Sequence, residues 1–245
     1  MNQTIEQLFK RKSVRVFTDQ DISKEDKQLI LESAIQAPSA GNQQLYTIID
    51  VTDENLKKEL AIVCDNQPFI AQGKMVLIFL ADCQKWYDAY INVDCSPRDP
   101  GTGDLLLAVS DANIAAQNAV VAAESLGIGS CYIGDVVEGC EKMRELLNLP
   151  DFVFPTCMLI FGYPTKQQID RKKPERPDTK YIVHENSYKR FNKEEQIDYF
   201  TYKIIKEYYK ESMTAFCNRK YNSDFSKEMS RSVDAYLKHF PKHKL

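Results

Sequence analysis

The stretch MVLIFLA, Met75–Ala81, decides the fold, because seven consecutive apolar residues do not show the alternation of a half-exposed strand. Such a run predicts a strand that is covered on both faces. LYTIIDV (Leu45–Val51) has the same character, and FVFPTCMLIFGYP (Phe152–Pro164) predicts another buried strand. IGSCYIGDV (Ile128–Val136) predicts a strand followed by a turn. The chain therefore contains a sheet with other elements on both of its faces.

Helical patterns alternate with these strands. Ser23 can cap a helix that ends before Pro38. The longest helical pattern, Asp104–Leu126, holds seven alanines spread almost around its circumference, and Gly127 follows in the position where a left-handed residue is wanted. Small side chains on most faces predict close packing in a core or across a subunit contact. Further helical patterns cover residues 54–64 and 138–147. This alternation predicts an α/β or α+β sandwich.

The last third of the chain has a different composition. Residues 165–182 form a basic, proline-bearing segment that predicts a loop. A separate loop, earlier in the chain, is predicted over residues 82–104 and is placed to lie near a substrate. Lys193–Phe216 and Phe225–Phe240 are helical patterns with many aromatic residues. Aromatic residues at helical spacing are more typical of a core or an interface than of a cofactor site.

Composition restricts the class of protein. A chain of 245 residues, of which 43% are hydrophobic, predicts one domain of catalytic size with a possible appendage. A net charge of -3 argues against nucleic acid as a partner. The seven cysteines include no C-x-x-C pair, which predicts buried, reduced thiols in a cytoplasmic protein and no metal site. No secretory signal opens the chain, and polar residues interrupt the apolar segment Leu105–Leu126, so we expect no membrane span.

Glycine motifs do not provide a phosphate site. Gly101-Thr102-Gly103 lacks a third glycine, and Gly127-Ile128-Gly129 follows a helix and precedes a strand, the reverse of the dinucleotide-binding order. A phosphate would therefore be held by side chains. Three cations surround Ser13 in RKSVR (Arg11–Arg15), and Lys173 and Arg176 form a second basic group. Such charges are often a solvated surface, but together with the loop Pro38–Asn42 they favour a phosphorylated cofactor.

These segments carry a family resemblance. R-x-S-x-R at Arg11–Arg15, A-P-S-A-G-N at Ala37–Asn42, N-Q-P-F-I at Asn66–Ile70, S-L-G-I-G-S-C-Y-I-G at Ser125–Gly134 and G-Y-P with its basic follow-on occur in this order. Over roughly residues 4–190 the chain resembles the FMN-dependent nitroreductase and flavin reductase family. The resemblance implies an α+β fold with a central, mostly antiparallel sheet flanked by helices, in an intertwined homodimer with FMN at the interface.

The resemblance also implies roles for individual residues. Arg11, Ser13 and Lys173 would hold the 5′-phosphate of FMN, Arg15 would reach the pyrimidine edge, and Ser39 and Asn42 would contribute from the partner chain. Gln67 would bond the ribityl chain or ring edge, and the Tyr132–Gly134 backbone would pass near flavin N5. The expected set of cofactor-binding residues is completed by Lys12, Pro38, Ala40, Ile133 and Arg176. Relatives often read K-P-R where this chain reads Lys173-Pro174-Glu175-Arg176, so we expect Arg176 to substitute.

Some of these residues have alternative structural interpretations. Gln67 could cap the following helix, Tyr132 could be an ordinary strand aromatic, and Trp86 could pack in its loop without touching substrate. The expected organisation is a nitroreductase-like FMN-binding domain over residues 1–190, followed by a helical extension over residues 191–245 that packs on the partner subunit.

The resemblance implies that hydride passes from NADPH or NADH through FMN to a small acceptor such as a nitroaromatic, a quinone or a free flavin. A cation near the pyrimidine would favour the reduced flavin by on the order of a few kcal/mol. We therefore expect no catalytic side chain. The alternatives are other flavin chemistry, namely dehalogenation, azole oxidation or flavin destruction, and a non-catalytic flavin-binding or sensing dimer.

Overall fold

The computed structural model describes residues 1–241, which form two compact units. The first unit contains Met1–Arg171 together with residues 228–241, and the second contains Lys172–Lys227. These limits differ from the expected boundary after residue 190. Residues 242–245 of the expected extension lie outside the described residues.

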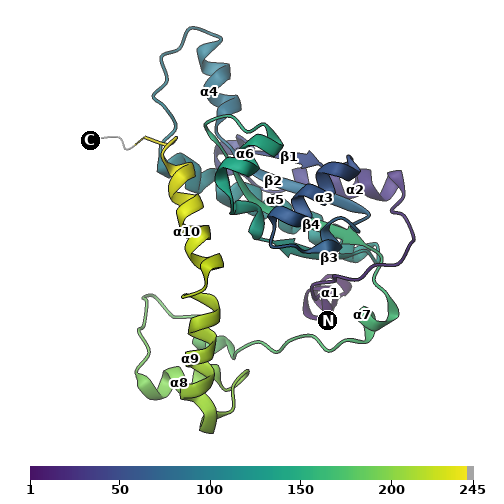
Figure 1. Cartoon of the computed structure of the whole chain (residues 1–245), viewed down its shortest axis with the longest axis vertical. Coiled ribbons are helices and arrows are strands. Elements are labelled where there is room, and N and C mark those ends of the chain that lie inside the picture. The colour runs from purple at the N-terminus through teal and green to yellow at the C-terminus, as the bar shows by residue number, and fades with distance from the viewer. Residues whose placement is uncertain (242–245) are drawn as a thin grey trace. The chain divides into compact units, whose positions relative to one another are not determined.

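The first unit is built on an antiparallel sheet. Its strands are β1 (Tyr46–Asp50), β2 (Met75–Asp82), β3 (Gly129–Ile133) and β4 (Val153–Gly162). In the described chain they lie in the order β1-β2-β4-β3, and each neighbouring pair is antiparallel (Figure 1). Every residue of β2 is buried, as the unbroken apolar run predicts. The α+β fold with an antiparallel sheet is confirmed.

Helices cover both faces of this sheet. On one face, α2 (Lys24–Ile35) and α5 (Thr102–Ser125) bury side chains against strand residues that include Leu77 and Phe161. On the other face, a second apolar cluster contains residues of α3 (Glu54–Val63) and α6 (Cys140–Leu147), with Val76 and Ile160 from the sheet. The last helix, α10 (Asp224–Leu237), adds Tyr236 to this second cluster.

Helix α5 has the packing that its alanines predict. Ala108, Ala112, Ala115, Ala116, Ala119 and Ala123 are fully buried, and Gly127 follows the helix at φ 74°. Among the described residues, α5 alone has the length and apolar composition that would also suit a membrane span. A buried core helix meets the same criteria, and the alanine face of α5 lies against the sheet.

The remaining helices of the first unit are short. Helix α1 (Gln3–Lys10) precedes the basic segment. Helix α4 (Gln84–Ile91) occupies part of the expected 82–104 loop, and the Trp86 and Tyr90 rings lie 5.8 Å apart on it. Helix α7 (Lys166–Asp170) lies in the expected 165–182 loop. The ammonium group of Lys12 bonds main-chain carbonyls at the end of α7, a distant contact that no local pattern reveals.

The second unit contains α8 (Lys193–Phe200) and α9 (Tyr209–Lys220). The single helix expected over Lys193–Phe216 is therefore wrong. It is interrupted after Thr201, whose hydroxyl donates to the Asp198 carbonyl at 2.7 Å. Thr201 and the β-branched pair Ile204-Ile205 lower the helix propensity of this segment. Tyr181, Phe191 and Tyr199 pack ring against ring in this unit.

The end of the described chain belongs to the core of the first unit. Tyr236 is fully buried and its ring lies 5.0 Å from that of Phe154, while Phe240 lies 5.8 Å from Phe152. This part of the expected extension thus packs on its own chain. The expectation of buried thiols is confirmed for five of the seven cysteines, and their reduced state stays a prediction.

Candidate functional site

The basic segment RKSVR lies along the edge of the sheet. The main-chain amide of Val14 donates to Ser130 in β3 at 2.9 Å, and the amide of Thr18 donates to Tyr163 after β4 at 2.8 Å. Glycine makes this close approach possible. A Cβ atom at Gly129 would lie 2.6 Å from Val14 Cγ2. The sheet therefore fixes the backbone that carries Arg11, Ser13 and Arg15.

Arg11 has unsatisfied hydrogen-bond donors. Its Nε and Nη2 atoms are buried and have no hydrogen-bond partner among the described residues. The guanidinium carbon lies 5.9 Å from the centre of the Tyr132 ring. A buried cationic donor without an acceptor is costly, so this side chain is arranged for an anion.

Ser13 and Arg15 lie near the same point as Arg11. Burial raises the pKa of the Cys131 thiol, and this rise is opposed by the charge of Arg15, the side chain of Ser13 and the charge of Arg11. The three side chains that the sequence singled out are thus brought together around one buried strand residue. Gln168 was missed: it is buried, and its side-chain oxygen accepts from the Arg15 amide at 3.3 Å.

Lys12 faces a different partner. Its ammonium group donates to the carbonyl of Ile169 at 2.6 Å and to that of Arg171, and the Arg171 guanidinium donates to the Ser13 carbonyl. These bonds join the basic segment to the end of α7. A direct role of Lys12 toward a cofactor stays a prediction.

The loop that follows α2 carries Pro38, Ser39, Ala40 and Asn42. Ser39 Oγ accepts from the Gln44 amide at 3.1 Å, and Asn42 Oδ1 accepts from the Gln44 side chain at 2.8 Å. Both Gly41 and Asn42 have φ 56°. The loop thus has a defined conformation, held in part by side chains within it.

Asp111 anchors this loop from helix α5. Its carboxylate is buried and accepts from the main-chain amides of Ala40 at 2.9 Å and Leu45 at 3.2 Å. Trp86 adds a bond from its indole nitrogen to the Gln43 carbonyl at 2.8 Å. The anchoring role of Asp111 was not predicted from the sequence. Its signal was a carboxylate within an alanine-rich helix.

The segments around Gln67 and Gly134 adjoin one another. Gln67 makes no side-chain cap to the following 3-10 turn and instead donates to the Cys64 carbonyl at 2.9 Å. Burial raises the pKa of Cys64 to about 12, assisted by the nearby charges of Asp135 and Glu138. A Cβ atom at Gly134 would meet no described atom within 4 Å. The backbone after β3 is therefore open to a ligand.

Tyr132 and Ile133 precede this open backbone in β3. Ile133 is buried, whereas the Tyr132 hydroxyl donates to Gln117 in α5 at 3.2 Å. Burial raises the pKa of Tyr132, an effect that the charge of Arg11 opposes. The ring of Tyr132 thus forms part of the surroundings of Arg11.

Lys173 and Arg176 lie in the second unit. There the segment Lys172–Arg176 and residues 201–205 line a cavity of about 870 Å³. Glu175, the departure from the expected K-P-R pattern, pairs with Lys172 at 3.0 Å. Arg176 donates from Nη1 to the carbonyls of Pro174 at 3.1 Å and Glu175 at 3.3 Å.

One buried carboxyl was not expected. Glu138 is 8% exposed, and its Oε1 atom has no hydrogen-bond partner among the described residues. Burial raises its pKa to about 7, with further increases from Asp135, Asp65 and Glu228. Glu138 follows Gly134, the end of the predicted flavin segment, by four residues along the chain.

The site suits an anionic cofactor such as FMN. The two buried, unpartnered nitrogen atoms of Arg11 need an acceptor, Ser13 and Arg15 lie beside them, and the Gly134 backbone is uncovered. Among the described residues no group of three or more His, Cys, Asp or Glu side chains could hold a metal ion.

Comparison with known proteins identifies the family of the chain. Residues 8–163 match the Nitroreductase family. The chain is 32% identical to "FMN reductase (NADPH)" of Bacillus subtilis over 247 residues, covering 100% of this chain and 98% of that protein. The solved structure of B. megaterium NfrA2 is 29% identical, with a TM-score of 0.85 and complete coverage of both chains. NADPH:FMN oxidoreductase from Vibrio harveyi, solved with NAD+, is 29% identical, with a TM-score of 0.75 and 97% coverage of both chains.

The fold and the basic cluster define an α+β protein that presents buried cationic donors at the edge of an antiparallel sheet. The chain belongs to the nitroreductase family, and the resemblance carried by its five sequence segments is confirmed.

Proposed function

We propose that the protein is an FMN-dependent NAD(P)H oxidoreductase that passes hydride from a nicotinamide to a small acceptor such as a nitroaromatic, a quinone or a free flavin. Its family and the names of its relatives support this reaction class. The observation that carries the proposal is the half-buried side chain of Arg11, whose buried Nε and Nη2 atoms have no acceptor among the described residues. When bound, FMN would supply the chemistry of hydride acceptance and release.

The protein residues bind, orient and tune this group. Arg11 and Ser13 hold the phosphate, while the phosphate roles of Lys173 and of Arg176, in place of the arginine expected at Glu175, stay predictions from the sequence. Arg15 approaches the pyrimidine edge, where its charge favours the reduced ring. Gln67 and the backbone of residues 132–134 orient the ring. No side chain of the protein has to act as an acid, base or nucleophile.

The active form in this proposal is a homodimer, in which Ser39 and Asn42 act on the partner's flavin. Support comes from apolar side chains of α5 that point away from its own core: Leu106 is 68% exposed and Leu107 is 51% exposed. Such side chains need a surface to cover them. The helices between residues 191 and 227 pack on the partner subunit in the same proposal. The proposed location of the enzyme is the cytoplasm, where free thiols persist.

Anaerobic stopped-flow mixing tests the reaction. Protein loaded with FMN is mixed with NADPH, and separately with NADH, while the flavin absorbance is followed. We expect the absorbance to bleach within seconds with at least one of them, and to return when a quinone is added. An oxidised spectrum that persists with both nucleotides would contradict the proposed reaction.

A further inference from the structure

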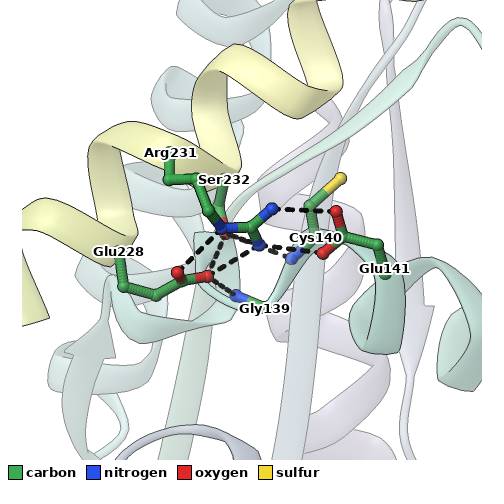
Figure 2. A network of polar contacts seen from close by, with 6 residues as sticks. All are labelled: Gly139, Cys140, Glu141, Glu228, Arg231 and Ser232. Atoms are coloured by element: carbon green, nitrogen blue, oxygen red, sulfur yellow. Dashed lines mark hydrogen bonds and ion pairs between the residues drawn. The ribbon is translucent and has the colours of Figure 1, made fainter.

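Helix α6 begins at a residue that cannot cap it. Gly139 occupies the N-cap position at φ 55° and ψ 51°, and it has no side chain to accept the free amides of the first turn. Helix α10 supplies these acceptors from about ninety residues further along the chain. Glu228 Oε1 accepts from the Gly139 amide at 3.2 Å, and Ser232 Oγ accepts from the Cys140 amide at 3.1 Å (Figure 2).

The two capping side chains are themselves held in place. The Ser232 hydroxyl donates to Glu228 Oε1 at 2.8 Å, and Arg231 donates to both carboxylate oxygens of Glu228 at 2.8 Å. The same guanidinium makes a two-pronged contact with Glu141, again at 2.8 Å for each bond (Figure 2). Arg231 thereby ties α10 to α6, and it keeps the Glu228 carboxylate charged beside the amides of the helix N-terminus.

The capped helix start is joined to the predicted flavin segment by five residues. Within that connection the Val137 amide donates to the Gly134 carbonyl at 3.1 Å, and the Glu138 amide donates to Asp135 at 3.0 Å. Val136 is fully buried. At the other end, β3 is fixed by its pairing with β4, where Ile133 lies opposite Met158. The backbone of residues 134–139 is therefore held by the sheet at one end and by α10 at the other.

Attachment of α10 does not depend on these polar groups alone. Tyr236 and Phe240 bury their rings in the core of the same unit. Polar contacts added to an apolar anchor specify register more than they add stability. Here the polar contacts fix the positions of Gly139 and Cys140 relative to α10.

We propose that Glu228 and Ser232 are positioning residues for the flavin: by capping α6 they hold the residue 134–139 backbone in the conformation that receives the ring. The inference rests on the proposed function. Neither side chain contacts the reacting atoms, so the effect is transmitted through the turn between β3 and α6.

Ser232→Ala and Glu228→Gln test the inference in the full-length protein. Ser232→Ala removes one acceptor from a fully buried position, whereas Glu228→Gln retains the shape of a partly exposed side chain and is expected to fold. Asp234→Asn is the matched control, since it neutralises an exposed carboxylate on the same helix. Amide hydrogen exchange of residues 134–141 is measured without FMN. The Kd for FMN and the flavin midpoint potential are measured separately.

We expect the Gly139 and Cys140 amides of both variants to exchange at least about fivefold faster than in the wild type. The Kd for FMN should rise about three- to tenfold with a shifted midpoint potential, and Asp234→Asn should match the wild type. If the wild type binds FMN and both variants have the same Kd for FMN and the same flavin midpoint potential as the wild type, this inference alone is overturned. Unchanged amide exchange would overturn it as well. Wild-type protein that binds no FMN would overturn the proposed function, and this inference with it.

Discussion

Asp111 in helix α5 accepts a hydrogen bond from the main-chain amide of Ala40, at 2.9 Å, in the loop that carries Ser39 and Asn42. The second oxygen of the same buried carboxylate accepts from Leu45 at 3.2 Å, at the start of the chain into β1. One side chain of the core helix therefore fixes both ends of a loop predicted to reach the cofactor.

Asp111→Asn is expected to destabilise the protein, because the two main-chain amides donate to different carboxylate oxygens and the Nδ2 group that replaces one of these oxygens cannot accept. Leaving one buried donor unpaired should lower the free energy of unfolding by about 1–3 kcal/mol. Urea unfolding of the protein without FMN measures this difference, with the exposed Asp234→Asn as control. Equal midpoints for Asp111→Asn and the wild type would show that the loop does not depend on this carboxylate.

Replacement of Arg11 separates binding from stability. Arg11→Met removes two buried donors that have no partner, so the free energy of unfolding without FMN should not fall. The Kd for FMN should rise at least about tenfold, because a charged hydrogen-bonding group is lost. Lys10→Met is the control, since the neighbouring Lys10 side chain is 78% exposed. Fluorescence titration with FMN gives the Kd of each variant. Equal Kd values for Arg11→Met and Lys10→Met would rule out the phosphate role of Arg11.

Substitution of Gly129 tests the close packing of the basic segment Arg11–Arg15 against β3. In Gly129→Ala the new Cβ atom would lie 2.6 Å from Val14 Cγ2, so the segment has to shift. Overpacking of this kind should cost about 1–3 kcal/mol of stability. Gly103→Ala is the matched control, because a Cβ atom there meets nothing within 4 Å. The double variant Gly129→Ala/Val14→Ala should recover part of the loss, and a double variant no better than Gly129→Ala would contradict this packing.

Glu138 predicts a pH dependence of stability. Its pKa is raised by burial from 4.5 to about 7. Between these two pH values the Glu138 carboxyl is protonated in the folded protein and ionised in the unfolded chain. The resulting stabilisation is fully present below pH 4.5 and is lost as the pH rises through about 7.

Glu138→Gln keeps the site neutral, so it should abolish this part of the pH dependence. Between pH 5 and pH 8 we expect the wild type to lose about 1–3 kcal/mol more than the variant does. Urea unfolding at the two pH values measures it. Parallel losses in both proteins would show that Glu138 ionises normally.

Local patterns were sufficient for most of the first unit. The continuous run Met75–Ala81 became the fully buried strand β2, and the alanine-rich segment became α5, which ends before Gly127 as expected. Both features depend on burial, which a sequence records directly as hydrophobicity and side-chain size. The convergence of Arg11, Ser13 and Arg15 followed from their closeness in the chain.

Features that depend on distant contacts were not predictable. Asp111 lies 66 residues from Leu45, and Ser232 lies 92 residues from Cys140, so no local pattern joins either pair. The break after Thr201 had a local signal in its β-branched residues, but the aromatic spacing on either side concealed it. Helix α7 depends in part on Lys12, more than 150 residues away.

Cationic side chains at the sheet edge are proposed to hold FMN, and the visible spectrum of the purified protein shows whether they do. Purified protein is incubated with FMN, desalted and scanned. We expect the wild type to retain the flavin absorption bands and Arg11→Met to lose them. Wild-type protein that emerges colourless, or an Arg11→Met variant that retains the same absorbance as the wild type, would contradict this proposal.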